Sequence, residues 1–411
     1  MHQLISVFGL LVMLGLAWLM SSHKRKVSIR IVIGGLCLQF LFAGVILRTA
    51  PGEYLFEQLD LLFVGLLNCV SAGSEFLFGD DFGDHFFAFK VLPTIIFFSA
   101  FMSIFYYYGV MQKVVGLFAR MMQRTLGTSG AETLSTAANV FVGQTEAPLV
   151  IRPYINSMTV SELNAVMVGG FATMAGGVLG ALVEMGISAK HLLGASVIAA
   201  PAALLIAKIL QPETAEPDTL GGVKLKVENE HANVLDAIAE GTVGGLKLAL
   251  NVGAMLIVFL ALIALVNGIL GWVGGQFGFD SAEGQSQWSL EAILGFVFAP
   301  VAWVIGIEWK DCPRAGELMG LKMAANEFIA YGRLAEWDKP DSLVHLSERS
   351  RTILTYALCG FANFSSIGIQ LGGIGGIAPK RRGDLAKLGF RAMLGGTLAA
   401  FMTACVASIF L

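Results

Sequence analysis

The sequence predicts an all-α integral membrane protein with about eight transmembrane helices plus two re-entrant hairpins in inverted repeats. Three observations support this fold class. The chain of 411 residues is 55% hydrophobic and only 14% charged, whereas soluble chains carry roughly 25% charged residues. Apolar stretches of the length that crosses a bilayer, about 20 residues, recur along the chain. Two further apolar regions are broken by Gly and Pro and carry carboxylates in their middles.

The predicted spans follow one another along the whole chain. They cover residues 3–21, 28–47, 88–110, 162–186, 190–210, 247–273, 350–374 and 389–410. Basic residues follow the first apolar stretch instead of preceding it, which is the reverse of a signal peptide, so we expect a retained helix. Residues 52–79 are amphipathic and acidic, which favours a place at the membrane interface. Residues 112–152 and 288–330 are the predicted hairpins.

Charged residues orient the predicted spans. Residues 51–89 contain no Lys or Arg but seven acidic side chains, whereas basic residues gather at 24–30, 113–124 and 380–391. Short loops rich in Lys and Arg stay in the cytoplasm. We therefore expect both termini outside, the first hairpin entering from the cytoplasm, the second entering from outside, and the loop at 212–235 in the cytoplasm.

A short internal repeat divides the chain. Gly170-Phe171-Ala172-Thr173 recurs as Gly360-Phe361-Ala362-Asn363, and each copy follows a broken region that carries a carboxylate. Interrupted helices at corresponding places of two inverted halves indicate the site of a secondary transporter. We expect an N-terminal scaffold at 1–84, a first repeat at 85–211, a polar loop and connecting helix at 212–246, and a second repeat at 247–411.

Composition excludes several classes of site. A net charge of −3 gives no basic footprint for nucleic acid. The five cysteines are scattered, without a CxxC pair or neighbouring histidines at ligand spacing, so neither a disulfide framework nor a metal cluster is indicated.

The first broken region carries four polar side chains between Asn139 and Pro148. Pro148 removes a backbone donor and disfavours helix at the preceding residue. Irregular backbone at membrane depth is tolerated only where it is buried in protein or lines a watery cavity. Glu146 in that setting is a functional candidate. The alternative is a carboxylate in a cytoplasmic loop near Arg152.

The later polar positions leave two interpretations open. Glu327 lies in the second broken region as Glu146 lies in the first, but it could instead form a structural pair with Lys322. Asn363 and Ser366 are three residues apart, hence on one helical face, where they could bind ligand hydroxyls or join helices. The glycine run at 372–376 lacks the Lys-Ser ending of a phosphate-binding loop. Acids, amides and hydroxyls suit a neutral, hydroxyl-rich solute.

These segments resemble the concentrative nucleoside transporters. The resemblance lies in Gly143-Gln144-Thr145-Glu146-Ala147-Pro148, in Asn326-Glu327-Phe328 and in Phe361-Ala362-Asn363-Phe364-Ser365-Ser366. It runs from about residue 85 to the C-terminus. It implies the bacterial eight-span form: a homotrimeric symporter of the inner membrane that imports nucleosides by alternating access.

The resemblance also implies roles for individual residues. The nucleobase would meet Gln144, Thr145, Glu146, Val178 and Phe361, and the ribose hydroxyls would meet Glu327, Asn363 and Ser366. A coupling Na⁺ would be held by the side chains of Asn139 and Thr173 and by the backbone oxygens of Val142 and Met174. The chain has Thr173 where a serine is often found, which keeps a hydroxyl available.

Two other functions are weighed against sodium-coupled import. Coupling to protons, carried by Glu146 or Glu327, is the alternative within transport. An intramembrane enzyme using these two carboxylates as general acid and base is the alternative from another class. The broken regions contain no Ser-His or Cys-His arrangement and no HExxH motif, and the chain carries no nucleotide-binding domain. We therefore expect no enzyme activity, no cofactor and no nucleic-acid partner.

Overall fold

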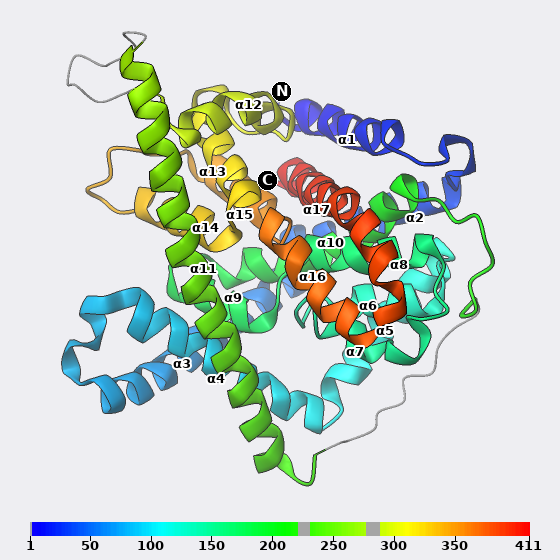
Figure 1. The fold of residues 1–411 in the computed structure, drawn as a ribbon, viewed down its shortest axis with the longest axis horizontal. Helices are drawn as coiled ribbons and strands as arrows, with labels where there is room; N and C mark the ends of the chain where they lie inside the picture. Colours follow the sequence, from blue (N-terminus) through cyan, green and yellow to red (C-terminus); the bar gives the residue numbers. More distant parts are fainter. Residues whose placement is uncertain (1, 221–230, 277–287) are drawn as a thin grey trace.

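The described part of the chain is mostly helical and contains no strand. The computed structural model describes residues 2–220, 231–276 and 288–411 (Figure 1). The first half contains α1 (His2–Leu19), α2 (Ile29–Arg48), α3 (Ala50–Phe78), α4 (Leu92–Tyr107), α5 (Val110–Leu126), α6 (Gly130–Ala138), α7 (Ala147–Val150), α8 (Val160–Ala172), α9 (Gly176–Glu184) and α10 (Ala189–Leu210). The second half contains α11 (Val234–Gln276), α12 (Leu290–Val304), α13 (Cys312–Ala324), α14 (Glu327–Trp337), α15 (Glu348–Leu358), α16 (Phe364–Ile377) and α17 (Arg382–Phe410).

Within the described residues, 7 segments are long and apolar enough to cross a membrane. They confirm the all-α membrane fold class, although their bounds differ from the prediction. The span predicted at 350–374 is wrong as a single helix, because α15 ends at Leu358 and α16 begins at Phe364. The span at 162–186 is likewise interrupted, between Ala172 and Gly176. Residues 50–78 form a 29-residue helix that is also long and apolar enough to cross, not only a short interfacial segment.

Both hairpins are smaller than the predicted regions. Residues 110–126 form a separate amphipathic helix, α5, so the first hairpin consists of α6, a turn at 139–146 and α7. Residues 290–304 form α12, which packs along α13, and the second hairpin is α13 with α14, reaching Trp337. The predicted boundary at residue 246 falls inside α11, which is continuous for 43 residues. An apolar pattern alone does not distinguish a hairpin arm from a neighbouring helix.

The core surrounds α8, α10 and α17. Their most apolar windows are 83% to 89% buried inside the molecule, whereas the window of α11 is only 11% buried. In Figure 1, α11 runs from the upper left to the bottom of the molecule. Its 43 residues give a length of about 64 Å, twice the hydrocarbon thickness of a bilayer. A helix this long and this apolar on its exposed faces must be strongly tilted in a bilayer or covered by other protein.

Buried capping groups fix the base of the first hairpin. Glu132 caps α6 by accepting from the backbone of Ser129, and Glu162 caps α8 by accepting from Thr159. The Ser129 hydroxyl also donates to Glu162 at 2.6 Å, which joins the two helix starts. Lys208 of α10 lies 2.7 Å from the Glu132 carboxylate, with both side chains buried. The hairpin base is therefore anchored to the buried helices α8 and α10.

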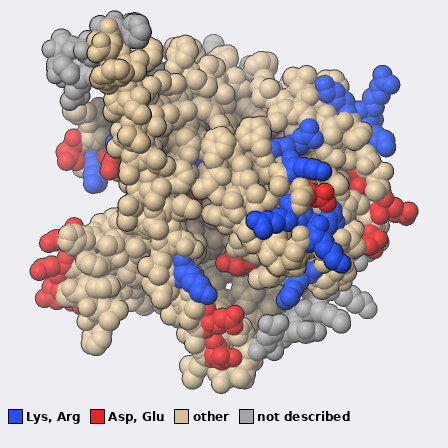
Figure 2. Space-filling model, viewed as in Figure 1, with Lys and Arg blue, Asp and Glu red and all other residues tan. Residues whose placement is uncertain are grey.

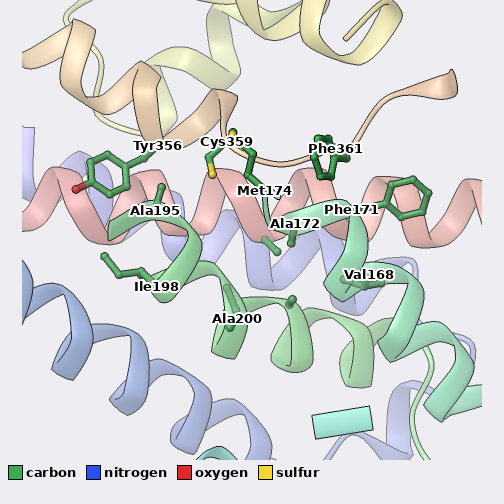
Figure 3. Packing of buried hydrophobic residues seen from close by; sticks show 14 of the residues in the cluster. Val168, Phe171, Ala172, Met174, Ala195, Ile198, Ala200, Tyr356, Cys359 and Phe361 are labelled. Atoms are coloured by element: carbon green, nitrogen blue, oxygen red, sulfur yellow. The ribbon is translucent and has the colours of Figure 1, made fainter. Parts of the chain in front are cut away.

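The two interrupted helices meet where they are broken. Gly360, between α15 and α16, has φ of +96°, a conformation that side chains with a Cβ rarely adopt. A Cβ on Gly360 would lie 2.7 Å from the backbone of Ala172, the last residue of α8. Figure 3 shows the segment with Cys359 and Phe361 lying against Ala172 and Met174. The repeated Gly-Phe-Ala sequence thus falls at both helix breaks, and these breaks touch.

We predict that Gly360→Ala destabilises the protein more than Gly186→Ala. Gly186 also has positive φ, +92°, but nothing lies within 4 Å of a Cβ there. Its substitution should cost only the left-handed strain, about 1–2 kcal/mol. Gly360→Ala adds a collision with backbone that cannot move freely, so its midpoint of thermal unfolding in detergent should fall at least about twice as far. Equal shifts for the two variants would show that the helix breaks do not pack as described.

Candidate functional site

The turn of the first hairpin lies against the first helix break. The backbone N–H of Gly176, at the start of α9, donates to Phe141 in the turn at 3.1 Å. The backbone N–H of Gly143 donates to the carboxylate of Glu146, which folds the turn back on itself. Pro148 occupies the first turn of α7, where its missing donor is harmless. The polar segment therefore forms a compact, ordered tip.

The four predicted cation ligands lie in this turn and at the first helix break. Asn139 is 1% exposed, and neither atom of its amide has a hydrogen-bond partner among the described residues. Its Nδ2 would lie 3.3 Å from a Cβ on Gly169, whose carbonyl accepts from the Thr173 hydroxyl at 2.8 Å. None of the hydrogen bonds found between described residues uses the carbonyls of Val142 or Met174. Free carbonyl, amide and hydroxyl oxygens are the ligands that a hard cation prefers.

The second hairpin meets the second break through hydrogen-bonded side chains. Asn326 caps α14, which places Glu327 as the first residue of that helix. The Asn363 amide donates to the Glu327 carboxylate at 3.2 Å, and its oxygen accepts from the backbone of Ser366 at 2.9 Å. The prediction that Asn363 and Ser366 lie on one helical face is wrong, because Asn363 precedes α16 as its N-cap. Capping nevertheless brings the two polar groups together.

Lys322 holds the broken end of α15. Its ammonium group is buried and donates to the carbonyls of Ala357 at 3.1 Å and Cys359 at 2.9 Å. The Tyr331 hydroxyl donates to the Thr355 carbonyl at 2.7 Å from the other arm of the hairpin. These carbonyls would otherwise be unpaired at a buried helix end. The alternative of a direct Lys322–Glu327 ion pair is not found in the described part of the chain.

One contact joins the two halves of the site. The Gln144 amide, at the first hairpin tip, donates to the Ser366 hydroxyl of α16 at 3.2 Å. A hydrogen-bonded series therefore runs from Gln144 through Ser366 and Asn363 to Glu327. Thr145 lies beside the same helix, because a Cβ on Gly373 would be 2.6 Å from its methyl group. Residues more than 200 positions apart thus form one buried polar cluster.

Other predicted residues lie near this cluster without joining the series. Val178 is buried in α9 and Phe361 is buried in the second break. Glu146 lines a cavity of about 360 Å³ that is also bounded by α4 and α11. Glu327, Asn363 and Ser366 do not line this cavity. Of the predicted site residues, the cavity therefore reaches only Glu146 and Val142, both in the turn of the first hairpin.

Comparison with known families supports one assignment. The model for the "Na+ dependent nucleoside transporter" N-terminus matches residues 8–81, and the C-terminal model matches residues 191–408. The intervening residues 88–189 match a model described as "Nucleoside recognition". A transporter of Haemophilus influenzae, described as uncharacterized, is 45% identical over 417 residues, covering 100% of this chain and 98% of the relative. This chain belongs to the sodium-dependent nucleoside transporter family.

Vertebrate members of the sodium-dependent nucleoside transporter family are also similar. Solute carrier family 28 member 3 of Eptatretus stoutii is 45% identical over 99% of this chain and 60% of the relative. Sodium/nucleoside cotransporter 1 of Rattus norvegicus is 44% identical over 99% of this chain and 64% of the relative. The chain therefore spans about three fifths of the length of these vertebrate relatives.

Solved structures of the family match along the whole chain. CNTnw in an inward-facing substrate-bound state is 42% identical, with a TM-score of 0.92 over 100% of this chain and 98% of that chain. A CNTnw variant in an outward-facing state gives a TM-score of 0.92 over the same shares. The family thus adopts both inward-facing and outward-facing states, as alternating access requires.

Sequence reasoning missed Gln370 and the role of Lys322. Gln370 is fully buried in α16 and its amide donates to Gln144 at 3.0 Å. It follows Ser366 by four residues, so it lies one turn further along the same helical face. An amide in an otherwise apolar, glycine-rich stretch was the available signal. Lys322 gave no such signal, because its carbonyl partners belong to a helix end that the hydropathy pattern does not reveal.

Proposed function

We propose that this chain is a secondary active symporter that imports nucleosides by alternating access, driven by the sodium gradient. The observation that carries the proposal is the buried series of amide, hydroxyl and carboxylate groups from Gln144 to Glu327. Such groups can bind a neutral solute that carries both a heterocyclic base and vicinal hydroxyls. Membership of the sodium-dependent nucleoside transporter family supports sodium as the coupling ion.

The site divides into a base end and a ribose end. We assign Gln144, Thr145, Glu146, Val178 and Phe361 to the base, and Glu327, Asn363 and Ser366 to the ribose hydroxyls. The ion is assigned to Asn139, Thr173 and the carbonyls of Val142 and Met174. Asn139 and Gln144 belong to the same short turn, so ordering of this turn by the ion would also order the groups that meet the base. Ion binding and nucleobase binding would be coupled through this turn.

Transport in proteoliposomes tests the function directly. Labelled uridine should accumulate when an inward sodium gradient is imposed at fixed pH. A pH gradient without sodium should drive no accumulation, and the recovered nucleoside should be chemically unchanged. Accumulation that follows the pH gradient and ignores sodium would instead establish proton coupling by Glu146 or Glu327. Cleavage or conversion of uridine would establish an enzyme.

The proposed location is the inner membrane of a bacterium, with both termini outside. Charge distribution supports this orientation. Figure 2 shows Lys and Arg gathered toward the right of the molecule, while a group of acidic residues lies at the lower left, where Figure 1 draws α3. The exposed segment after α3 contains Asp80, Asp81 and Asp84. Separation of this kind is typical of a chain oriented by its basic cytoplasmic loops.

We further propose a homotrimer with one pathway in each protomer. The resemblance to the concentrative nucleoside transporters supports the trimer, and the exposed apolar faces of α3 and α11 are surfaces that lipid or a neighbouring protomer can cover. Light scattering corrected for detergent should give three times the chain mass of 43.8 kDa. A monomeric mass in a preparation that still transports uridine would contradict the trimer.

Asn139→Ala should weaken sodium binding more than nucleoside binding. The substitution removes a buried amide oxygen that has no other partner in the described structure. The apparent sodium affinity should fall about tenfold or more, while uridine affinity at saturating sodium should change little. Asn164→Ala is a matched control, because Asn164 is equally buried in α8 but donates to Ala207. Unchanged sodium dependence of uptake in Asn139→Ala would remove this residue from the ion site.

Glu327→Gln should lower uridine affinity through the ribose. A carboxylate can accept from two vicinal hydroxyls, whereas an amide replaces one acceptor by a donor. An unpaired buried group costs about 1–3 kcal/mol, and about 1.4 kcal/mol is a factor of ten. Calorimetry should therefore show a loss of about ten- to a hundredfold for uridine and a smaller loss for 3′-deoxyuridine.

The control for this substitution is Glu317→Gln. Glu317 is buried in α13 of the same hairpin, where it pairs with Arg314 at 3.1 Å. It should leave the ratio of uridine to 3′-deoxyuridine affinity unchanged. Equal losses for both ligands in Glu327→Gln would mean that Glu327 acts structurally and does not contact the ribose.

A further inference from the structure

Gln370 hydrogen-bonds both to Gln144, which is predicted to contact the nucleobase, and to a backbone carbonyl of α8. Its side chain is fully buried in α16, one turn beyond Ser366. The Nε2 atom donates to the carbonyl of Met167 in α8 at 3.1 Å and to Oε1 of Gln144 at 3.0 Å. The Gln144 amide in turn donates to Ser366. Two amides are therefore connected in series, beginning at a backbone carbonyl.

This series determines which way each amide is turned. A backbone carbonyl only accepts, so the Nε2 of Gln370, and not its oxygen, must face Met167. The second N–H of that group then faces Oε1 of Gln144. Turning Gln370 over would bring its oxygen against the acceptor oxygens of Met167 and Gln144, and turning Gln144 over would bring two N–H donors together. A glutamine amide has no other strong preference between its two orientations. The Met167 carbonyl therefore fixes the orientation of Gln370, and Gln370 in turn fixes that of Gln144. The Gln144 oxygen accepts from Gln370, and its NH2 group faces Ser366.

The two amides pack closely against a glycine of α8. Gly170 of α8 lies behind both amides. A Cβ at Gly170 would be 2.9 Å from the Cβ of Gln144 and 2.9 Å from Nε2 of Gln370. Gly170 lies two residues before the end of α8, so the amide pair packs beside the first helix break. A residue larger than glycine at position 170 would displace both amides.

We propose that Gln370 is a positioning residue that presents an N–H donor of Gln144 to an acceptor atom of the nucleobase. This inference rests on the proposed function. The acceptor is a ring nitrogen or carbonyl oxygen, which every common nucleobase carries, so the device favours planar heterocycles over simple polyols. Without Gln370 the Gln144 amide can turn over and present its oxygen instead. The affinity for nucleosides should then fall because a contact to the nucleobase is lost, while the contacts to the ribose remain.

A double-mutant cycle with Gln144 tests this role. Uridine binding is measured calorimetrically at saturating sodium for the wild type, Gln370→Met, Gln144→Ala and the double variant. Gln370→Met should weaken uridine binding about three- to tenfold in the wild-type background and should have no further effect when Gln144 is already Ala. The same loss should appear with 3′-deoxyuridine, because the ribose contacts are intact. Gln39→Met is the control, since Gln39 is fully buried in α2 and its amide has no partner in the described structure.

The outcomes separate positioning from simple stabilisation. Equal losses in both backgrounds, or no loss in either, would overturn the role of Gln370 while leaving nucleoside binding intact. If the wild type binds no uridine, the proposed function itself fails. If Gln370→Met does not fold, Gln370→Glu preserves the size of the side chain and enters the same cycle. An ionised carboxylate at position 370 only accepts hydrogen bonds. Gln370→Glu should therefore weaken uridine binding at least as much as Gln370→Met, and again only when Gln144 is present.

Discussion

The structure depends on satisfying backbone groups where two helices are broken inside a membrane protein. Neither lipid nor bulk water can pair a freed N–H or carbonyl at that depth. Side chains pair these backbone groups instead. Lys322 and Tyr331 donate to the last carbonyls of α15, and Asn363 caps α16. Gly360 lets one break pack directly on the other. The hairpins are placed where they are because they supply these partners.

The groups that stabilise the breaks are also those that can recognise a solute. Asn363 caps a helix with its oxygen and holds Glu327 with its nitrogen. Gln144 belongs to the first hairpin but is bound by residues of α16. A ligand that replaces any of these contacts alters the packing between a hairpin and a broken helix. In the proposed function, binding and conformational change are therefore coupled through the same hydrogen bonds, as a transporter of the alternating-access type requires.

The sequence predicted the membrane fold, the two hairpins with their carboxylates, and the residues of the polar series. It did not predict where the helices break or end. The interruption at 359–363 contains no proline and is maintained by Lys322 and by the backbone of Ala172, both remote in sequence. The amphipathic helix α5 and the apolar helix α12 were included in the hairpins because they directly adjoin them and the sequence pattern does not mark where one helix ends. Gln370 was missed because its importance comes from Met167 and Gln144, which only the folded chain brings together.

The central claim is that ion and nucleoside share one turn of the first hairpin, so that each strengthens binding of the other. Calorimetric titration of uridine at several sodium concentrations, and of sodium with and without uridine, measures this coupling in both directions. Thermodynamic linkage requires the two factors to be equal. We expect sodium to tighten uridine binding and uridine to tighten sodium binding by that same factor, typically five- to 150-fold for coupled sites. Uridine affinity that is independent of sodium would contradict the account.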